Sequence, residues 1–311
     1  MAQQKRVVVG IDGGGTKTRA LLVGFDGVIL AEATGGASNI QKKGVPEAAE
    51  LFFDLVQKCA EKAEAPHSAI AHVVVGAAGA GRPSTRSELS AAISALAQKN
   101  KFPLSQVTVE TDARIALEAA FPGKPVIALI GGTGSIALYR ADDLRIHRAG
   151  GWGSIIGDEG SGYAIARDAC AAVMRHYDGR SEKTLLTEKL LAHFDLREVE
   201  DLIPKIHAEK TEIAPFAEKV CQAVAERDRV ARQILLKHAA ELVEHVRILA
   251  LAHPPKNKLP VCLMGGLLEN ENEYSKLVRE KLVATLPQIV VQKPKFPAAF
   301  GAAILGMNAF R

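Results

Sequence analysis

Hydrophobic positions near the start of the chain fall in short, continuous runs that are separated by turn residues. The run at 6–11 predicts a buried strand, and the stretch 19–30 predicts two more strands joined at an Asp26-Gly27 turn. Between the first two strands stand three consecutive glycines, in the sequence DGGGTKT at 12–18. The order strand, glycine-rich turn, strand, turn, strand therefore predicts that these glycines close a β-hairpin.

Strands and helices alternate through the rest of the first half. The first predicted helix carries Pro46, which suits a first helical turn. The second can be capped by Ser84 or Thr85 together with Glu88. The expected segments are the helices 45–65, 83–100 and 113–121, a buried strand running into a glycine-rich loop at 71–81, and a strand at 106–113.

The opening pattern returns in the second half of the chain. Residues 125–143 again read strand, glycine-rich turn, strand, turn, with element lengths close to those of 6–27. Two Gly-Thr hairpin tips, one in each half, predict a duplicated domain. Two unrelated hairpins are the alternative interpretation.

The remainder of the chain is mostly helical. Residues 164–253 predict helices, the last of them long and amphipathic at 230–253. The whole pattern predicts an α/β protein built as two lobes with a cleft between them. Four later elements complete it: a strand and loop at 260–270, a helix at 273–286, a strand at 287–294 and a small-residue helix at 296–310, opened by Pro297.

The first glycine run fits neither of two familiar phosphate-binding motifs. A P-loop has Lys directly after its last Gly, whereas Thr16 follows Gly15 here and Lys17 comes one place late. A dinucleotide fingerprint has Gly at its sixth position, and that position, counted from Gly13, is Thr18. What remains is a hairpin tip whose backbone N–H groups can form an anion cradle, or a plain tight turn.

Two such tips can hold a polyphosphate from both sides, because glycine lets the main chain approach the oxygens closely. Thr16 and Thr133 add hydroxyl donors. Asp12 stands beside the first tip, where a carboxylate can hold Mg²⁺ directly or through water. The backbone of a later glycine pair, Gly265-Gly266, can run alongside an adenine or ribose, although a structural turn explains the pair equally well.

Composition narrows the class of protein. Net charge is +4 with basic and acidic residues interleaved, which indicates no nucleic-acid surface. The sequence has neither a signal-peptide pattern nor an apolar run long enough to span a bilayer, so we expect a soluble, cytoplasmic protein without a membrane partner. Four cysteines stand far apart in apolar settings, which predicts reduced, buried thiols rather than a zinc site or disulfides: Cys59, Cys170, Cys221 and Cys262.

Three polar or aromatic residues have both a structural and a functional interpretation. Asp112 ends a strand and begins a helix, where an Asp is first of all an N-cap. Asn39 suits a turn, or a pair of ligand hydroxyls to which its amide can both donate and accept. Trp152 is the only tryptophan and has Gly on both sides, which supplies no walls for core packing and favours stacking on a ligand.

The motifs DGGGT, TDA, GGTGS, GGWG, GDEGSGY and MGG follow one another in this order along nearly the whole chain. The set resembles the N-acetylglucosamine kinase and BadF/BcrA-type ATPase family, within the sugar kinase, heat-shock chaperone and actin superfamily. The resemblance implies a two-lobed actin-like ATPase fold, ribonuclease H-like, with a duplicated core and an interlobe cleft. The N-terminal lobe would comprise 1–115 with 296–311, and the C-terminal lobe 116–295.

The resemblance also implies roles for individual residues. Asp112 would be the catalytic base, and Gly151 and Trp152 would border a 2-acetamido group. Glu159 would be a second polar contact or only a first-turn helix acid. The implied ATP-binding residues are Gly13, Gly14, Gly15, Thr16, Lys17, Thr18, Gly131, Gly132, Thr133, Gly134, Gly265 and Gly266. The implied sugar-binding residues are Asn39, Gly79, Asp112, Gly151, Trp152 and Asp158.

The implied activity is phosphorylation of the 6-hydroxyl of an amino sugar with ATP and Mg²⁺, most simply N-acetylglucosamine, by a homodimer. Ala78 and Gly79 stand where the animal-type kinases carry a Ser-Gly-Gly, so one sugar contact is lost here or supplied by the backbone, and glucosamine is an alternative substrate. From another class, the chain could be the activator ATPase of a 2-hydroxyacyl-CoA dehydratase or benzoyl-CoA reductase, which binds an iron–sulfur cluster through cysteines. A regulatory ATP-binding protein without kinase activity is a third alternative.

Overall fold

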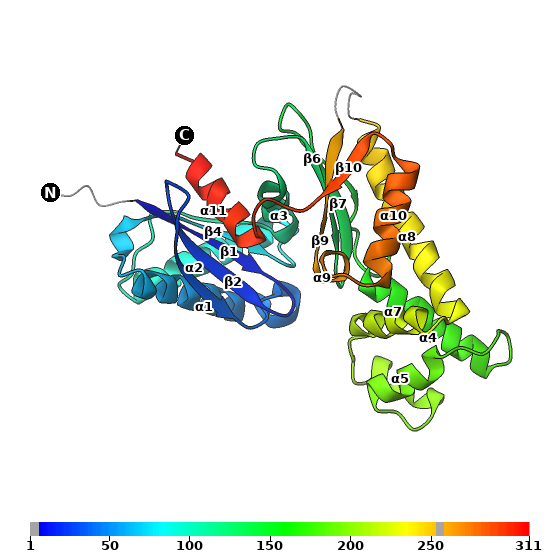
Figure 1. Ribbon diagram of the computed structural model, residues 1–311. Helices are drawn as coiled ribbons and strands as arrows, with labels where there is room; N and C mark the ends of the chain where they lie inside the picture. Colours follow the sequence, from blue (N-terminus) through cyan, green and yellow to red (C-terminus); the bar gives the residue numbers. More distant parts are fainter. Residues whose placement is uncertain (1–5, 253–257, 311) are drawn as a thin grey trace. The chain divides into compact units, whose positions relative to one another are not determined.

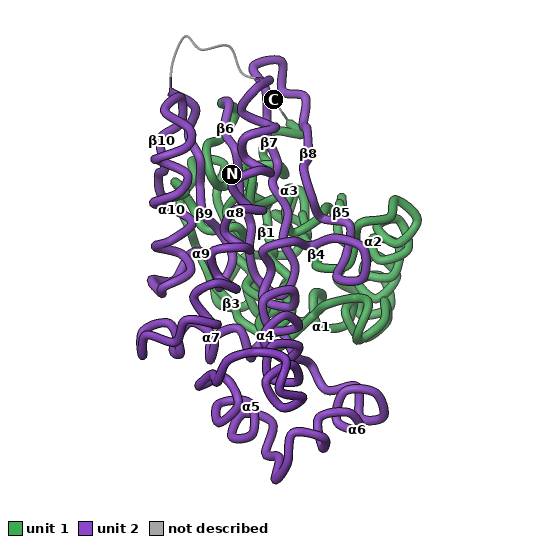
Figure 2. Tube along the Cα trace, turned by 90° about the vertical axis from the view of Figure 1, so that its right-hand side faces the viewer, with its two compact units in different colours: residues 1–124, 294–311 green, residues 125–293 purple. Residues whose placement is uncertain are grey.

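A computed structural model describes residues 6–252 and 258–310. The chain forms two compact units, unit 1 from Met1–Lys124 with Pro294–Arg311 and unit 2 from Pro125–Lys293. Figure 1 shows the elements of both, and Figure 2 colours the units separately. The last residues of the chain therefore return to the unit in which it begins.

Unit 1 is built on a mixed sheet of β1 (Val7–Gly13), β2 (Thr18–Gly24), β3 (Ile29–Gly35), β4 (Ile70–Ala77) and β5 (Val107–Thr111). The strand order is β3-β2-β1-β4-β5. β1 and β2 pair antiparallel up to Gly13↔Thr18, which confirms the predicted hairpin. β3 continues antiparallel to β2, whereas β4 and β5 run parallel to β1.

Helices cover both faces of this sheet: α1 (Ile40–Lys62) and α2 (Pro83–Lys99) on one, α3 (Asp112–Ala120) and α11 (Ala298–Asn308) on the other. The side-chain alternation of β1 explains the two layers. Val7, Val9 and Ile11 belong to the core under α1 and α2, while Val8 packs with α11. α11 lies close to α3 because Gly301 has no Cβ, which would stand 2.1 Å from the Ile115 carbonyl oxygen.

The three predicted helices of this part are present, but the first turn or the cap of each differs in detail from the prediction. α1 begins earlier than expected, with Asn39 as N-cap, and breaks at Gly44 (φ 79°) before Pro46. α2 begins at Pro83, as predicted, so its N-cap is Arg82, whose side chain has no acceptor oxygen, and Ser84 and Thr85 lie inside the first turn. The expected Ser84, Thr85 and Glu88 cap is therefore absent. The N-cap of α3 is Thr111, whose Oγ1 accepts from Arg114 N at 3.1 Å, so Asp112 is the first helical residue instead.

Unit 2 repeats the strand plan of unit 1. Its sheet contains β6 (Val126–Gly131), β7 (Ser135–Arg140), β8 (Ile146–Gly150), β9 (Leu259–Met264) and β10 (Ile289–Gln292). In the order β8-β7-β6-β9-β10, β7 and β8 follow on one side of β6 with each pair antiparallel, and β9 and β10 follow on the other side with each pair parallel, as around β1. This common plan confirms the duplication. β8 was not among the predicted strands, because its residues are exposed or half-buried and form no apolar run.

The helices of unit 2 enclose a single apolar core that includes Tyr139, Phe216 and Tyr274. α8 packs on β6, β7 and β8, and α10 packs on α8. The predicted long helix ends at Ala250, and the expected end at His253 lies outside the described residues. The helices are α4 (Gly162–Tyr177), α5 (Leu186–Phe194), α6 (Leu202–His207), α7 (Ala217–Ala225), α8 (Arg229–Ala250), α9 (Gly266–Glu269) and α10 (Glu273–Thr285). Short 3-10 turns occupy His67–Ala69, Val199–Asp201 and Ala214–Phe216.

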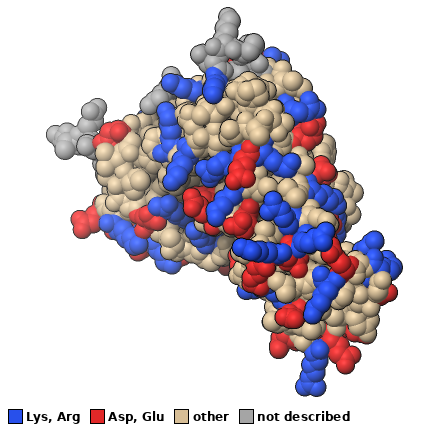
Figure 3. Space-filling view, turned by 45° about the vertical axis from the view of Figure 1, so that its right-hand side comes forward, with Lys and Arg blue, Asp and Glu red and all other residues tan. Residues whose placement is uncertain are grey.

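The described residues include no helix that is both long and apolar enough to cross a membrane. On the face drawn in Figure 3, basic and acidic side chains are interspersed rather than gathered by sign. This face offers no block of positive charge for a phosphate backbone.

Candidate active site

In unit 1, the parallel strands end in one row. Gly13 at the end of β1 pairs with Ala77 at the end of β4, and Ala77 pairs with Thr111 at the end of β5. The segments that follow these residues therefore share one edge of the sheet. Ligands of open α/β sheets bind at the carboxyl ends of strands, so this edge is the candidate site of unit 1.

The first tip is a short loop closed by a hydrogen bond from Gly14 N to Lys17 O at 3.1 Å. Gly15, Thr16 and Lys17 are exposed, so the backbone N–H groups there and the Thr16 hydroxyl are accessible to a ligand. Asp12 lies half-buried directly before the tip, in register with Arg19 of β2.

Thr18 has a structural role beneath this tip. It is fully buried, and its hydroxyl lies 2.7 Å from Gly36 O and 2.8 Å from Ser38 Oγ. Ser38 N in turn donates to Gly14 O at 3.0 Å. These bonds hold the segment before α1 against the glycine run, so the buried Thr18 hydroxyl, predicted as an ATP contact, has a structural role instead.

Asn39 and Gly79 lie beside each other at the same edge. Asn39 Oδ1 accepts from Gln41 N at 2.9 Å, which caps α1 and leaves the amide Nδ2 as a donor that the cap does not use. Gly79 has φ +87°, and an added Cβ would stand 3.1 Å from Asn39 Oδ1. Backbone bonds from Ala78 N to Gly13 O and from Ile40 N to Ala78 O join both loops to the tip.

Asp112 stands at the first position of α3, one residue beyond the row of strand ends. Its Oδ1 accepts from Ala113 N at 2.9 Å. Asp112 is an exposed residue, yet the surrounding protein partly desolvates the carboxylate and raises its pKa above the ordinary value, against the lowering effect of the Ala113 N–H. A carboxyl with a raised pKa is suited to proton transfer near neutral pH.

The second tip has the corresponding place in unit 2. Gly132 N donates to Gly134 O at 2.9 Å, and Thr133 is exposed. The first residues of α4 bond to this tip, since Gly162 N donates to Gly132 O at 2.8 Å. The tip and the following glycine-rich loop thus form one structure.

Asp158 joins that loop to the tip. It is buried with φ 57°, and its Oδ1 accepts from Gly153 N at 3.0 Å. An added Cβ on Gly134 would stand 2.7 Å from its Oδ2. Burial raises the pKa of Asp158, partly offset by the Gly153 N–H. Ser135 Oγ donates to Glu159 O at 2.7 Å, a further link that no local sequence pattern indicates.

Gly151 and Trp152 lie in the same loop. Gly151 has φ +73°, and a Cβ there would stand 2.6 Å from the Ile136 side chain. Trp152 is 63% exposed, as its predicted ligand-binding role requires, and the Arg148 guanidinium lies 3.9 Å from its ring centroid. The indole therefore stands outside the core with one cation against its ring.

Glu159 has a partner that the sequence did not indicate. His245 of α8 places its Nε2 3.7 Å from a Glu159 carboxylate oxygen. The same imidazole packs against Gly150, where an added Cβ would stand 2.7 Å from the ring. Burial lowers the pKa of His245, and the carboxylates of Glu159, Glu241, Glu244 and Asp158 oppose this effect. His245 thus supports the loop from behind.

The third glycine pair meets the second tip. Gly265 follows the end of β9 with φ +83°, and an added Cβ would stand 2.5 Å from Gly131 O. Gly266 then begins α9. Gly265 is therefore required by a left-handed backbone and a close approach of two main chains, whichever ligand lies beyond.

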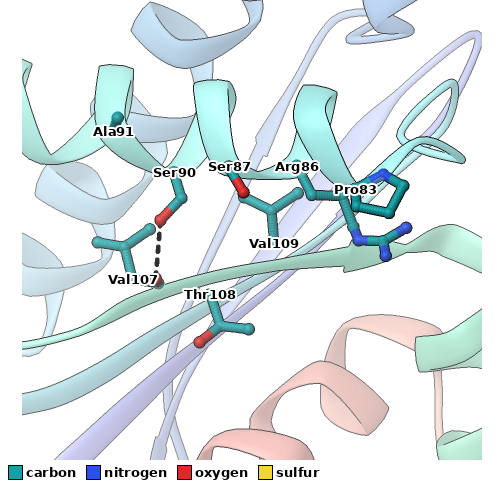
Figure 4. A pocket seen from close by; sticks show the side chains of 8 residues that line it. All are labelled: Pro83, Arg86, Ser87, Ser90, Ala91, Val107, Thr108 and Val109. Carbon is teal, nitrogen blue, oxygen red and sulfur yellow. Dashed lines mark hydrogen bonds between the residues drawn. The ribbon is translucent and has the colours of Figure 1, made fainter.

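A separate hollow of about 500 Å³ lies between α2 and β5 in unit 1 (Figure 4). Ser90 Oγ donates to Val107 O there at 2.8 Å. Arg86 turns its guanidinium to Ala80 O and Gly81 O, each at 3.1 Å, and so holds the loop after β4. The hollow contains none of the residues predicted for the site, and its lining is Pro83, Arg86, Ser87, Ser90, Ala91, Val107, Thr108 and Val109.

Two units of one strand plan, each with a glycine-rich tip at the carboxyl edge of its parallel strands, define a two-lobed ATPase of the actin-like class. A glucokinase of the ROK family from Streptomyces griseus shares this fold at a TM-score of 0.55 and 17% identity, over 96% of this chain and 98% of its own. More specifically, the chain belongs to the BadF/BadG/BcrA/BcrD ATPase family, which it matches over residues 9–306.

Relatives with named activities cover nearly the whole chain. An N-acetylmuramic acid/N-acetylglucosamine kinase from Clostridium acetobutylicum is 33% identical over 97% of this chain and 99% of its own. A glucosamine kinase from Vibrio cholerae is 28% identical over 86% of each. The solved structure of a protein provisionally assigned as an N-acetylglucosamine kinase, from Chromobacterium violaceum, matches at a TM-score of 0.78 and 27% identity, over 98% of this chain and 100% of its own.

Proposed function

We propose that the protein is an ATP-dependent amino-sugar kinase that phosphorylates the 6-hydroxyl of N-acetylglucosamine. The observation that carries the proposal is the row Gly13, Ala77 and Thr111, which brings the phosphate-type tip and Asp112 to one edge of unit 1. A phosphoryl donor and a general base for the acceptor hydroxyl are the two parts that such a transfer needs. The named activities of the relatives agree with this pairing.

In this proposal Asp112 accepts the proton of the 6-hydroxyl as the oxygen attacks the γ-phosphorus. Asn39 orients the sugar through its amide, and the Gly79 loop contributes backbone groups. Gly151, Trp152 and Asp158 bind the acetamido side and the remaining hydroxyls. The phosphates of ATP rest on the exposed N–H groups and on Thr16 and Thr133 of the two tips, and Gly265-Gly266 borders the adenosine.

Mg²⁺ fits this donor set in the manner usual for nucleotide kinases. The described residues contain no group of three or more His, Cys, Asp or Glu side chains that could enclose a metal. Mg²⁺ commonly needs only one or two carboxylates in addition to phosphates and water, and Asp12 beside the first tip can supply one. Bound there, the ion would neutralise charge on the phosphates.

A coupled ADP-release assay across hexoses and amino sugars tests the proposal. We expect ATP-dependent turnover with N-acetylglucosamine, a product phosphorylated at O6 by ³¹P NMR, and much lower turnover with glucose. The proposal would be contradicted if none of the sugars in the panel supported turnover. Glucosamine is the second candidate substrate, favoured by the name of the Vibrio relative and by the missing hydroxyl at Ala78.

The cysteines disfavour an activator ATPase with an iron–sulfur cluster. All four are buried within the units, on α1, α4, α7 and β9, and burial raises the pKa of each thiol to about 11 or 12. A cluster between subunits needs accessible thiolates. Iron analysis of the purified protein should find none.

We further propose a cytoplasmic homodimer, which light scattering can test.

A further inference from the structure

Arg148 is a cation held in place at the candidate sugar loop without an acidic partner. It lies on β8 three residues before Gly151, is exposed, and places its guanidinium carbon 3.9 Å from the Trp152 ring centroid. Among the described residues no carboxylate pairs with it, although Arg145 of the same hairpin pairs with Asp143. The two acids of the glycine-rich loop that follows β8 are engaged elsewhere, Asp158 with Gly153 N and Glu159 with His245.

Stacking on the Trp152 ring orients this guanidinium so that it can bind an anion. A guanidinium over an aromatic face keeps the N–H donors along its edges free, and these match the two oxygens of a carboxylate. The ring also fixes the position of the guanidinium and its paired N–H donors, so that less side-chain freedom is lost when an anion binds. Ile155 and Ile156 of the same loop are 91% and 77% exposed, which offers an apolar surface beside the charge.

We propose that Arg148 is a subsite for a carboxylate carried by the sugar substrate on a short apolar stem. The enzyme would then accept, besides the neutral amino sugar, an amino sugar with an acidic ether substituent, of which N-acetylmuramic acid is the available probe. This inference rests on the proposed function. The Clostridium relative carries this acidic sugar in its name, and in this chain the feature suited to the carboxylate is the stacked guanidinium of Arg148.

The test compares kcat/KM for N-acetylmuramic acid and for N-acetylglucosamine in the wild type, Arg148→Gln, Arg148→Lys and the control Arg145→Gln. The ratio of acidic to neutral sugar should fall about tenfold to a hundredfold in Arg148→Gln, the range for a charge-assisted hydrogen bond. Arg148→Lys should give an intermediate ratio, because it keeps the charge and loses the fork. Arg145→Gln should keep the wild-type ratio.

Two results would overturn the subsite while leaving the proposed function intact. One is a wild-type enzyme that phosphorylates N-acetylglucosamine but not the acidic sugar. The other is an Arg148→Gln variant that loses both sugars equally, or that raises KM for ATP with either sugar, which would assign Arg148 to loop structure or to phosphate. An enzyme that phosphorylates neither sugar would overturn the proposed function and this inference together.

Discussion

Asp112 owes its chemistry to its position in α3. As the first helical residue it stands next to unsatisfied backbone N–H groups, which stabilise a carboxylate, yet desolvation raises its pKa on balance. The sequence offered an N-cap as the simpler interpretation, and the structure gives that role to Thr111. Asp112 is thus left available for another function.

We expect Asp112→Asn to lower kcat by about 10²-fold or more, the usual loss for a general base. Nucleotide and sugar affinity should change little, because asparagine keeps the size and can still accept from Ala113 N. In the wild type, the acid limb of kcat/KM should lie above the ordinary range of an Asp carboxyl, as the raised pKa requires. Steady-state kinetics from pH 4.5 to 8 would show both effects, and wild-type turnover in the variant would exclude Asp112 as the base.

His245 should make the protein sensitive to acid. Burial lowers its pKa below the value of 6.5 expected in the unfolded chain, so the unfolded state binds the proton more tightly and folding loses stability as pH falls below about 6.5. Above that pH the imidazole is neutral in both states and contributes no pH dependence.

His245→Gln should therefore show a shallower loss of unfolding free energy between pH 7 and 5 than the wild type. Urea denaturation at several pH values measures it, with the exposed His207→Gln as control. Equal slopes for the wild type and His245→Gln would show that the imidazole does not carry this effect. His72 and His238 are also buried with lowered pKa values, so a reduced slope rather than a flat profile is expected.

At the scale of elements, the two glycines of the turn after β9 are not equivalent. Gly265 has a left-handed backbone and meets Gly131 O, whereas the next residue, Gly266, has open space where a Cβ would stand. Substitution at the first position strains the backbone and pushes two main chains apart. Substitution at the second places a methyl group at the start of α9.

Gly265→Ala should lower the free energy of unfolding by about 1–3 kcal/mol, the range for a non-glycine residue in a strained conformation. It should also weaken nucleotide binding, because the second tip must shift. Gly266→Ala should remain close to the wild type in stability. Chemical denaturation and titration with a non-hydrolysable ATP analogue measure both, and equal stability of the two variants would contradict the close approach of Gly265 to Gly131.

At the scale of the whole molecule, the proposal requires one nucleotide to engage both units. Each unit carries its own tip, at 13–18 and at 131–135, and the chain crosses between the units after Lys124 and again after Lys293. A ligand that binds both tips must protect the backbone amides of both, whichever unit contacts most of its surface.

Hydrogen exchange with and without a non-hydrolysable ATP analogue should therefore show added protection at 13–18 and at 131–135 together. Adding N-acetylglucosamine alone should instead change the fluorescence of Trp152, the sole tryptophan. Protection of only one tip would contradict the two-tip arrangement. Unchanged emission at saturating sugar, in an active enzyme, would place Trp152 away from the sugar.

The sequence by itself determined the hairpins, most of the helices and the duplication, because these depend on local patterns of apolar runs and turn residues. It also located the glycine turns and the exposed threonines at their tips. The family resemblance, rather than the local pattern, singled out Asp112, since an acid at the start of a helix has a sufficient structural explanation.

Only the tertiary structure decided the partners that come from distant segments. The pairing of Gly13, Ala77 and Thr111 in one row depends on the order of parallel strands, which no local pattern contains. For the same reason only the structure shows that the buried Thr18 hydroxyl hydrogen-bonds to the segment before α1, and that His245 and Arg148 contact the glycine-rich loop. Residues far apart in the chain meet through packing and strand pairing, and those contacts assign a polar side chain to structure or leave it free to bind a ligand.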